Sequence, residues 1–273
     1  MSTELPNLSE AVALTETQIE SFRTNGHILL TNVLSSREIA AYRPHLTETV
    51  EMCQRELEDK LAKGEVDEEL LGPINLRERN ERYYQFVTAR RFAKLAAELL
   101  GVEGVRIYRD NAIFKKPGAV YTRWHQDSDL TALDTDQIVT IWIPLVDLPA
   151  EIGSMKFISG SHKLNNRTES AMLKLRKATR QNLPTAWYGA MNAGDVTFHY
   201  GWTLHSANGN PSEITREVIT IMYFADRAKI VTEEEEIGFD LKKHLAEFFP
   251  GVRPGEVAAS PLNPLVYTTS SAP

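Results

Sequence analysis

Between residues 105 and 224 the sequence falls into short apolar runs that are rich in β-branched and aromatic residues. Turn signals such as Pro117-Gly118 and Gly194-Asp195 separate these runs. Short runs of this kind, bounded by turn residues, predict strands. Because helices do not alternate regularly with them, the pattern favours an antiparallel sandwich or jelly roll over a parallel sheet. The predicted strands are Val105–Phe114, Ile138–Val146, Met155–Ile158, Thr185–Tyr188, Val196–Tyr200 and Arg216–Phe224.

The residues before this region predict helices, and two of these helices begin with a capping box. In each box a hydroxyl residue is followed three positions later by Gln or Glu: Thr15 with Gln18, and Ser35 with Glu38. Pro44 lies inside the second helical pattern, so we expect a kink or two abutting helices there. The predicted elements are a helix from Thr15 to Gly26, the strand His27–Val33, a helical stripe from Ile39 to Leu61 and the helix Ala89–Leu100.

No Gly/Ser-rich or Pro-rich linker divides the 273 residues, which predicts a single domain spanning 1–273. We expect a helical part over about 15–100, a β core over about 105–226 that the helix Glu169–Arg180 interrupts, and a tail over 227–273. The fold class is therefore mostly β with flanking helices. In the tail, the acidic run Glu233–Glu236 predicts a solvated helix start and Leu241–Phe249 is amphipathic. We expect Pro250–Pro264 to lie extended over the surface.

Charge and cysteine content argue against several functional classes. The formal net charge of −7 supplies no basic footprint for nucleic acid and no attraction to an anionic membrane. Cys53 is the only cysteine, so an intrachain disulfide and a cysteine zinc site are excluded and a reducing compartment is favoured. The first 20 residues lack an apolar leader, and no apolar stretch could span a bilayer. We therefore expect a cytoplasmic protein.

The segment Trp124-His125-Gln126-Asp127 offers an imidazole and a carboxylate two residues apart. On an extended strand, residues i and i+2 point to the same face, so both side chains can reach one ion. His205 is the natural third ligand. Two histidines and a carboxylate form the facial triad of non-haem Fe(II) oxygenases, which leaves positions for a bidentate 2-oxo acid and O₂. By itself the His-x-Asp pair also fits a solvated loop beside a buried histidine.

The residues after His205 favour the metal interpretation. Arg216 follows it by eleven positions, after a turn at Asn208–Pro211, and opens an apolar run. A return strand would bring this guanidinium beside the metal, where it could bind the distal carboxylate of 2-oxoglutarate, while Ser206 adds a hydroxyl donor. A surface arginine at a strand end is the alternative. His199 competes for the ligand role, but the residue eleven positions after it is Asn210, which cannot hold a carboxylate as a cation does.

His125-x-Asp127, a long gap, His205 and Arg216 together resemble the phytanoyl-CoA dioxygenase family. The similarity extends over most of the chain. Further segments that are similar to the family are Phe22–Leu30, Trp142 with Pro144-Leu145, Gly153–Met155, Ile158–Lys163, Gly194-Asp195 and Phe249–Tyr267.

This resemblance implies a double-stranded β-helix, the cupin-like jelly roll, that uses Fe(II), 2-oxoglutarate and O₂. Decarboxylation of 2-oxoglutarate to succinate and CO₂ would be coupled to oxidation of a substrate C–H bond, by default hydroxylation. The metal ligands would be His125, Asp127 and His205, which are also the catalytic residues. The residues implied for the 2-oxoglutarate pocket are Arg216, Ser206, Trp142 and, by approximate alignment, Asn111 and Thr122.

Three other functions fit parts of the pattern. Related halogenases replace the carboxylate ligand with a small residue, so the presence of Asp127 argues against halogenation. A non-enzymatic binding module or pseudoenzyme would leave the triad residues inert, and Fe(II) binding distinguishes it from an enzyme. An acyl-CoA hydroxylase would favour a basic rim for the phosphates, which the net acidity does not suggest. We expect a small-molecule substrate, whereas the outcome of the oxidation and the oligomeric state are not encoded in any motif.

Overall fold

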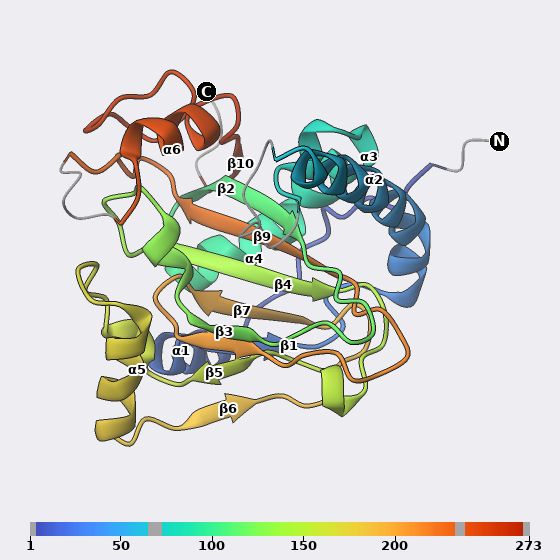
Figure 1. Cartoon of the computed structure of the whole chain (residues 1–273), viewed down its shortest axis with the longest axis horizontal. Coiled ribbons are helices and arrows are strands. Elements are labelled where there is room, and N and C mark those ends of the chain that lie inside the picture. The colour runs from blue at the N-terminus through green and yellow to red at the C-terminus, as the bar shows by residue number, and fades with distance from the viewer. Residues whose placement is uncertain (1–3, 65–72, 233–237, 270–273) are drawn as a thin grey trace.

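The computed structural model describes residues 4–64, 73–232 and 238–269, which form two antiparallel sheets with helices packed around them (Figure 1). The predicted acidic run Glu233–Glu236 lies outside these residues. The larger sheet has the order β1 (His27–Leu30), β7 (Val196–Tyr200), β4 (Ile138–Pro144), β9 (Val218–Ala225), β2 (Gly104–Ala112) and β10 (Leu265–Thr268). The smaller sheet has the order β3 (Thr122–His125), β8 (His205–Ala207), β5 (Lys156–Ile158) and β6 (Thr185–Trp187).

The helices precede, interrupt and follow the β core, as the sequence predicts. They are α1 (Glu16–Asn25), α2 (Ser36–Ala62), α3 (Glu81–Val87), α4 (Arg90–Leu100), α5 (Ala171–Arg180) and α6 (Leu241–Phe248). The 3-10 helices are η1 (Leu76–Glu78), η2 (Asp127–Leu130), η3 (Ala150–Ile152) and η4 (Ser161–Lys163). Among the described residues no helix combines the length and the apolar character that crossing a membrane requires.

Both predicted capping boxes are present and define where α1 and α2 begin. The hydroxyls of Thr15 and Ser35 accept hydrogen bonds from the backbone N–H three residues on, and the side chains of Gln18 and Glu38 accept from the cap residues in return. Gly26 ends α1 with a φ of 84°, a left-handed conformation that favours glycine. Of the two alternatives expected at Pro44, two abutting helices is wrong, since α2 runs through it as one helix, whereas a kink there stays a prediction.

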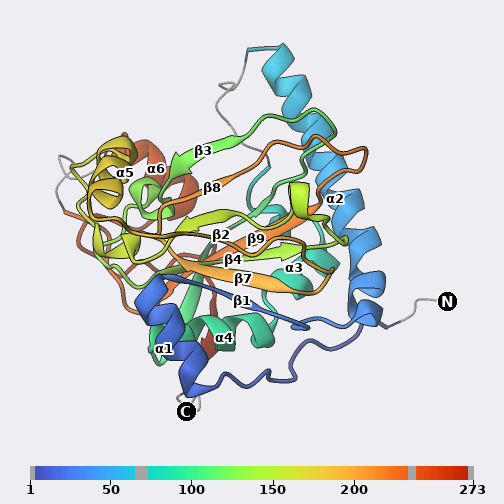
Figure 2. The same ribbon diagram turned by 90° about the horizontal axis from the view of Figure 1, so that it is seen from below.

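The largest apolar cluster fills the space between the N-terminal helices and the outer face of the larger sheet. Figure 2 shows α1 and α4 on the side of this sheet opposite β3 and β8. Along α4, Phe92, Leu95, Ala96 and Leu99 are fully buried at helical spacing. This arrangement leaves the inner face of the larger sheet turned toward the smaller sheet. Strand β1 at one edge and β10 at the other come from the N-terminal and C-terminal parts of the described chain.

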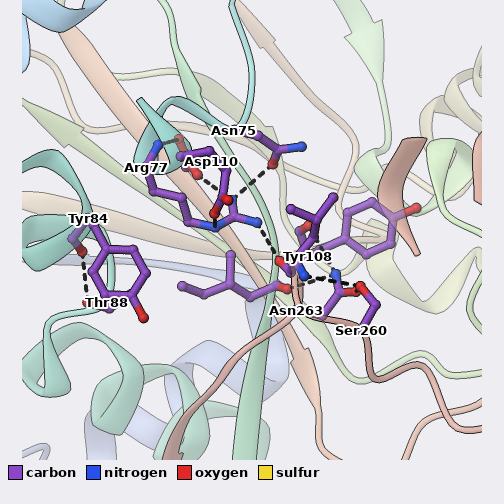
Figure 3. A network of polar contacts seen from close by, with 11 residues as sticks. Asn75, Arg77, Tyr84, Thr88, Tyr108, Asp110, Ser260 and Asn263 are labelled. Carbon is purple, nitrogen blue, oxygen red and sulfur yellow. Dashed lines mark hydrogen bonds and ion pairs between the residues drawn. The ribbon is translucent and has the colours of Figure 1, made fainter. Parts of the chain in front are cut away.

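The C-terminal tail differs from its prediction, because part of it is buried rather than extended over the surface. The Asn263 side chain is fully buried, and its amide donates to the backbone carbonyl of Ile107 at 3.2 Å. Nearby, Arg77 forms a buried ion pair with Asp110 and donates to the carbonyl of Leu262 (Figure 3). Buried backbone carbonyls and guanidinium groups need partners, and the tail meets this need. Strand β10, which the sequence did not predict, then pairs with β2.

His205 follows the run of residues that begins after Gly194-Asp195 and includes the predicted strand Val196–Tyr200, but it does not continue that strand. That run ends as β7 at Tyr200, and His205 opens a separate strand, β8, in the other sheet. The turn between them passes through Gly201, where a Cβ atom would lie 2.2 Å from the Ser128 hydroxyl. The chain therefore crosses between the sheets at a point that accepts only glycine without rearrangement.

Candidate active site

His125 and His205 lie opposite each other on neighbouring strands of the smaller sheet. His125 is the last residue of β3, His205 is the first of β8, and the two are direct cross-strand partners. Their ring centroids are 4.1 Å apart. A non-local pairing therefore brings together two imidazoles that are distant in sequence.

Asp127 reaches the same point from the start of η2, not from the strand itself as the sequence suggested. The expected alternation still holds, because Gln126 keeps an extended backbone with φ −129° and ψ 133°. The fully buried Gln126 side chain turns away and donates its amide to the carbonyl of Trp202. His125 and Asp127 thereby face the same side.

Three donor atoms converge as a result. The donor atoms of His125, Asp127 and His205 all lie within 4.8 Å of one another, the one such group among the described residues. The Asp127 Oδ1 atom is 3.8 Å from Nε2 of His125 and 3.7 Å from Nε2 of His205.

The other ring nitrogen of each histidine is already engaged. Nδ1 of His125 donates to the carbonyl of Arg123 at 2.8 Å, and Nδ1 of His205 donates to the carbonyl of Thr203 at 2.9 Å. A carbonyl can only accept, so each Nδ1 carries the proton and each Nε2 keeps a free lone pair. Fixing the tautomer through the distal nitrogen is the usual arrangement around metal-binding histidines.

The second oxygen of Asp127 is held by the larger sheet. Oδ2 accepts a hydrogen bond from the Thr140 hydroxyl on β4 at 2.7 Å and from His199 Nε2 on β7 at 3.1 Å. This leaves Oδ1 directed toward the two free imidazole nitrogens. His199 is thus a neighbour of the carboxylate and not a member of the group of three, which agrees with its rejection as a ligand on sequence grounds.

Burial and mutual interaction set the charges of these groups. Burial opposes ionisation of Asp127, but the neighbouring His205 and the hydrogen bond from His199 hold the pKa of this carboxyl well below its usual range. Burial, followed by the proximity of His125 and His199, lowers the pKa of His205 well below its ordinary value. An anionic carboxylate therefore faces a neutral imidazole, the protonation states that bind a divalent metal.

This donor set fits Fe(II). Two imidazole nitrogens and one carboxylate oxygen on a single side of the ion match the facial triad and leave the remaining positions toward the cavity. The hydrogen bonds that the outer carboxylate oxygen accepts and that both Nδ1 atoms donate orient all three ligand atoms before any metal binds.

Arg216 supplies a buried positive charge that has no partner in the part of the chain that the structure describes. Its side chain is about 1% exposed, and within the described chain its Nε atom has no hydrogen-bond acceptor. Its guanidinium carbon lies 5.7 Å from the centre of the Trp142 ring. Burial lowers the pKa of Arg216 to about 10, so it remains a cation at neutral pH. A buried cation of this kind is costly until an anion joins it.

Two other cations, Lys115 and Arg123, are not available to bind a ligand carboxylate at this end of the cavity. Lys115 donates to the carbonyls of Val120 and Asn208 and to the Thr122 hydroxyl, at 2.9, 3.2 and 2.8 Å. Burial, followed by the charge of Arg216, lowers the pKa of Lys115 to about 8. Arg123 is exposed. Arg216 is therefore the cation best placed to meet a ligand carboxylate.

One cavity brings together the residues that the sequence predicts for the site. Those lining it are His125, Asp127, His205, Arg216, Ser206, Trp142, Asn111 and Thr122. Trp142 also carries a buried indole N–H that has no acceptor among the described residues.

Sequence reasoning missed several residues of this cavity. The missed residues include Arg109, Thr140, Met155, Thr220 and Met222. Strand alternation could have found two of them, because Thr140 is two positions from Trp142 on β4, and Arg109 is two positions from Asn111 on β2.

Comparison with known families adds to this geometry. The profile described as phytanoyl-CoA dioxygenase (PhyH) matches residues 22–218, well over half of the chain. The chain belongs to the phytanoyl-CoA dioxygenase family. Members are non-haem Fe(II)- and 2-oxoglutarate-dependent oxygenases, so the predicted enzyme class and the requirement for Fe(II), 2-oxoglutarate and O₂ are confirmed. None of the curated proteins matches the chain.

Solved structures show the same fold. The 2-oxoglutarate-dependent carbocyclase SnoK from nogalamycin biosynthesis has a TM-score of 0.73 at 22% identity, covering 96% of this chain and 99% of its own. The epimerase SnoN from the same biosynthesis has a TM-score of 0.67 at 24% identity, covering 92% and 98%. EctD from S. alaskensis, solved with 2-oxoglutarate and 5-hydroxyectoine, has a TM-score of 0.61 at 18% identity, covering 93% and 91%. The predicted jelly-roll fold class is confirmed, with two sheets that do not close.

Because the buried charge of Arg216 has no partner among the described residues, we expect it to lower the stability of the protein while it favours binding of an anionic ligand. We expect Arg216→Met to raise the free energy of unfolding of the ligand-free protein by about 1–3 kcal/mol, because an apolar side chain replaces a buried, uncompensated cation. Chemical denaturation without metal or 2-oxoglutarate measures this change. The exposed Arg123→Met is the matched control and should stay within about 0.5 kcal/mol of the unsubstituted protein. A clear loss of stability in Arg216→Met would show that this guanidinium is paired in the ligand-free protein.

Proposed function

We propose that this chain holds Fe(II) through His125, Asp127 and His205, and binds the C5 carboxylate of 2-oxoglutarate at Arg216. The oxidised substrate is a small molecule, and the outcome is hydroxylation of a C–H bond. The observation that carries the proposal is that, among the described residues, three donor atoms and one buried guanidinium without an acceptor share a single cavity. Each of these groups lacks a partner that a metal ion or a 2-oxo diacid supplies.

The residues of the chain have separate tasks in this reaction. When bound, Fe(II) supplies the activation of O₂ that is coupled to decarboxylation of 2-oxoglutarate. Thr140 and His199 keep the Asp127 carboxylate in one orientation. Arg216 binds the distal carboxylate through two parallel hydrogen bonds, and Ser206 adds a hydroxyl donor. Burial of Arg216, beside the ring of Trp142, strengthens that pairing by excluding water.

The compared structures support a small-molecule substrate. SnoN was solved with Fe³⁺, α-ketoglutarate and nogalamycin RO, and EctD with 5-hydroxyectoine. These are small molecules of different classes, so the shared fold does not select among them. We also propose a cytoplasmic location, because the single cysteine, Cys53, is a buried free thiol.

Substitution of His125 tests the metal site. His125→Ala should abolish Fe(II) binding and succinate formation, because two remaining ligands cannot hold the ion in place. The fold should persist, since His125 is partly exposed and lies outside the apolar clusters. Anaerobic Fe(II) titration measures binding, and circular dichroism checks the fold. Full-strength Fe(II) binding by His125→Ala would move the metal site elsewhere.

Substitution of Arg216 tests binding of the co-substrate. Arg216→Ala should raise the 2-oxoglutarate concentration needed for half-maximal succinate formation by about tenfold to a thousandfold. Fe(II) affinity should change little, because Arg216 is not among the donor atoms. Arg216→Lys should recover part of the loss, since a point charge cannot reproduce the planar fork.

The assay measures succinate formation by the Arg216 variants while the 2-oxoglutarate concentration is varied at saturating Fe(II). An unchanged requirement in Arg216→Ala would assign the carboxylate to Lys115 or Arg123 instead. The triad could then still be correct, so the two assays test the metal and the co-substrate independently.

A further inference from the structure

The cavity contains a second cation that the proposed function does not use. Among the described residues that line it, Arg109 and Arg216 are the only lysine or arginine side chains. Arg109 is half-buried, and within the described parts of the chain its side chain forms no hydrogen bond or ion pair. Its guanidinium carbon lies 5.9 Å from the centre of the Phe248 ring on α6.

The register of the larger sheet places Arg109 beside the donor triad. Arg109 on β2 pairs with Met222 on β9, and Met222 pairs with Thr140 on β4. Thr140 in turn pairs with His199 on β7. The four residues form one row across the inner face, and two of them hold the Asp127 carboxylate. With neighbouring strands about 4.8 Å apart, Arg109 begins roughly 10 Å from Thr140 across the sheet.

Arg216 lies at a different place in the cavity. It precedes Met222 by six residues on the same chain segment, and its backbone pairs with Lys115 on the extension of β2. At about 3.3 Å per residue, six residues correspond to roughly 20 Å along the strand. Arg216 therefore begins several residues along the strand from the triad row, although its guanidinium reaches back to 5.7 Å from the centre of the Trp142 ring, whereas Arg109 begins within that row. Since the two guanidinium groups start from different strands and different rows, each can bind an anionic group of its own.

The surroundings of Arg109 suit a carboxylate. Contact with Phe248 covers one face of the guanidinium, which leaves its N–H edge free for the planar, two-bond pairing that carboxylates form. A single cation balances one negative charge. The several phosphates of a coenzyme A thioester would require more cations, and the thioester group itself is neutral.

We propose that Arg109 is a specificity-determining residue that binds a carboxylate of the substrate, so that the substrate is a small carboxylic acid oxidised close to that group. This inference rests on the proposed function, because it takes the triad row as the place of oxidation. A purely structural role, in which Arg109 only anchors α6 through Phe248, is the alternative.

The test uses benzoate and benzamide, which have the same size and differ in charge. Calorimetric titration under nitrogen, with the full chain loaded with Fe(II) and 2-oxoglutarate, measures both affinities. Benzoate should bind at least about tenfold more tightly than benzamide. Arg109→Met should remove this preference, and Arg109→Lys should keep part of it. Arg123→Met, an exposed arginine, should keep all of it.

Several results would overturn the inference. These are equal binding of the two probes, including no binding of either up to its solubility limit, and a preference that survives in Arg109→Met. Lower thermal stability of Arg109→Met with an unchanged preference would show that it only anchors α6. A weakened 2-oxoglutarate affinity in Arg109→Met, as in Arg216→Ala, would assign Arg109 to the co-substrate.

Failure of the proposed function gives a different result from failure of this inference. In that case the unsubstituted protein would not bind Fe(II) or 2-oxoglutarate in the loading titration that precedes the probes. Comparison of the benzoate titrations of the metal-free unsubstituted chain and of metal-free Arg109→Met then still reports on Arg109.

Discussion

The pair of hydrogen bonds to the outer oxygen of Asp127 is the interaction on which the rest of the site depends. Asp127 follows a strand of the smaller sheet, whereas its donors, Thr140 and His199, belong to the larger sheet. The carboxylate therefore links the two sheets and directs its inner oxygen at His125 and His205. Without that link the aspartate would have no fixed orientation, and the converging donor atoms would not be arranged in advance.

The same low-dielectric interior explains why the ligand-free site is electrostatically incomplete. Burial keeps His205 neutral, and among the described residues it leaves the charge of Arg216 without an acceptor. A neutral His205 imidazole and an anionic Asp127 carboxylate suit a divalent cation, while a buried guanidinium suits a dicarboxylate. The buried charge of Arg216 thus lowers stability at the place where ligands bind. The apolar packing of α4 against the larger sheet stabilises the fold and offsets this loss.

Short sequence motifs predicted correctly those features of the fold that depend only on residues close together in the chain. The capping boxes at Thr15 and Ser35 placed two helix starts, and turn residues around apolar runs placed most strands of the larger sheet. The family resemblance placed the candidate ligands. Sequence reasoning failed where pairing is non-local: the return of the tail as β10, the transfer of His205 to the other sheet, and the row that joins Arg109 to Thr140 and His199. Register across strands is set by tertiary packing, which no short motif records.

The most direct test of the central claim is a crystal structure of the protein grown without oxygen in the presence of Fe(II) and 2-oxoglutarate. We expect this structure to contain an ion bound by His125, Asp127 and His205, with ligand distances of about 2.0–2.2 Å. The distal carboxylate of 2-oxoglutarate should pair with Arg216, and Thr140 and His199 should still donate to Asp127. An ion bound elsewhere, or a distal carboxylate held by Lys115 or Arg109, would contradict it.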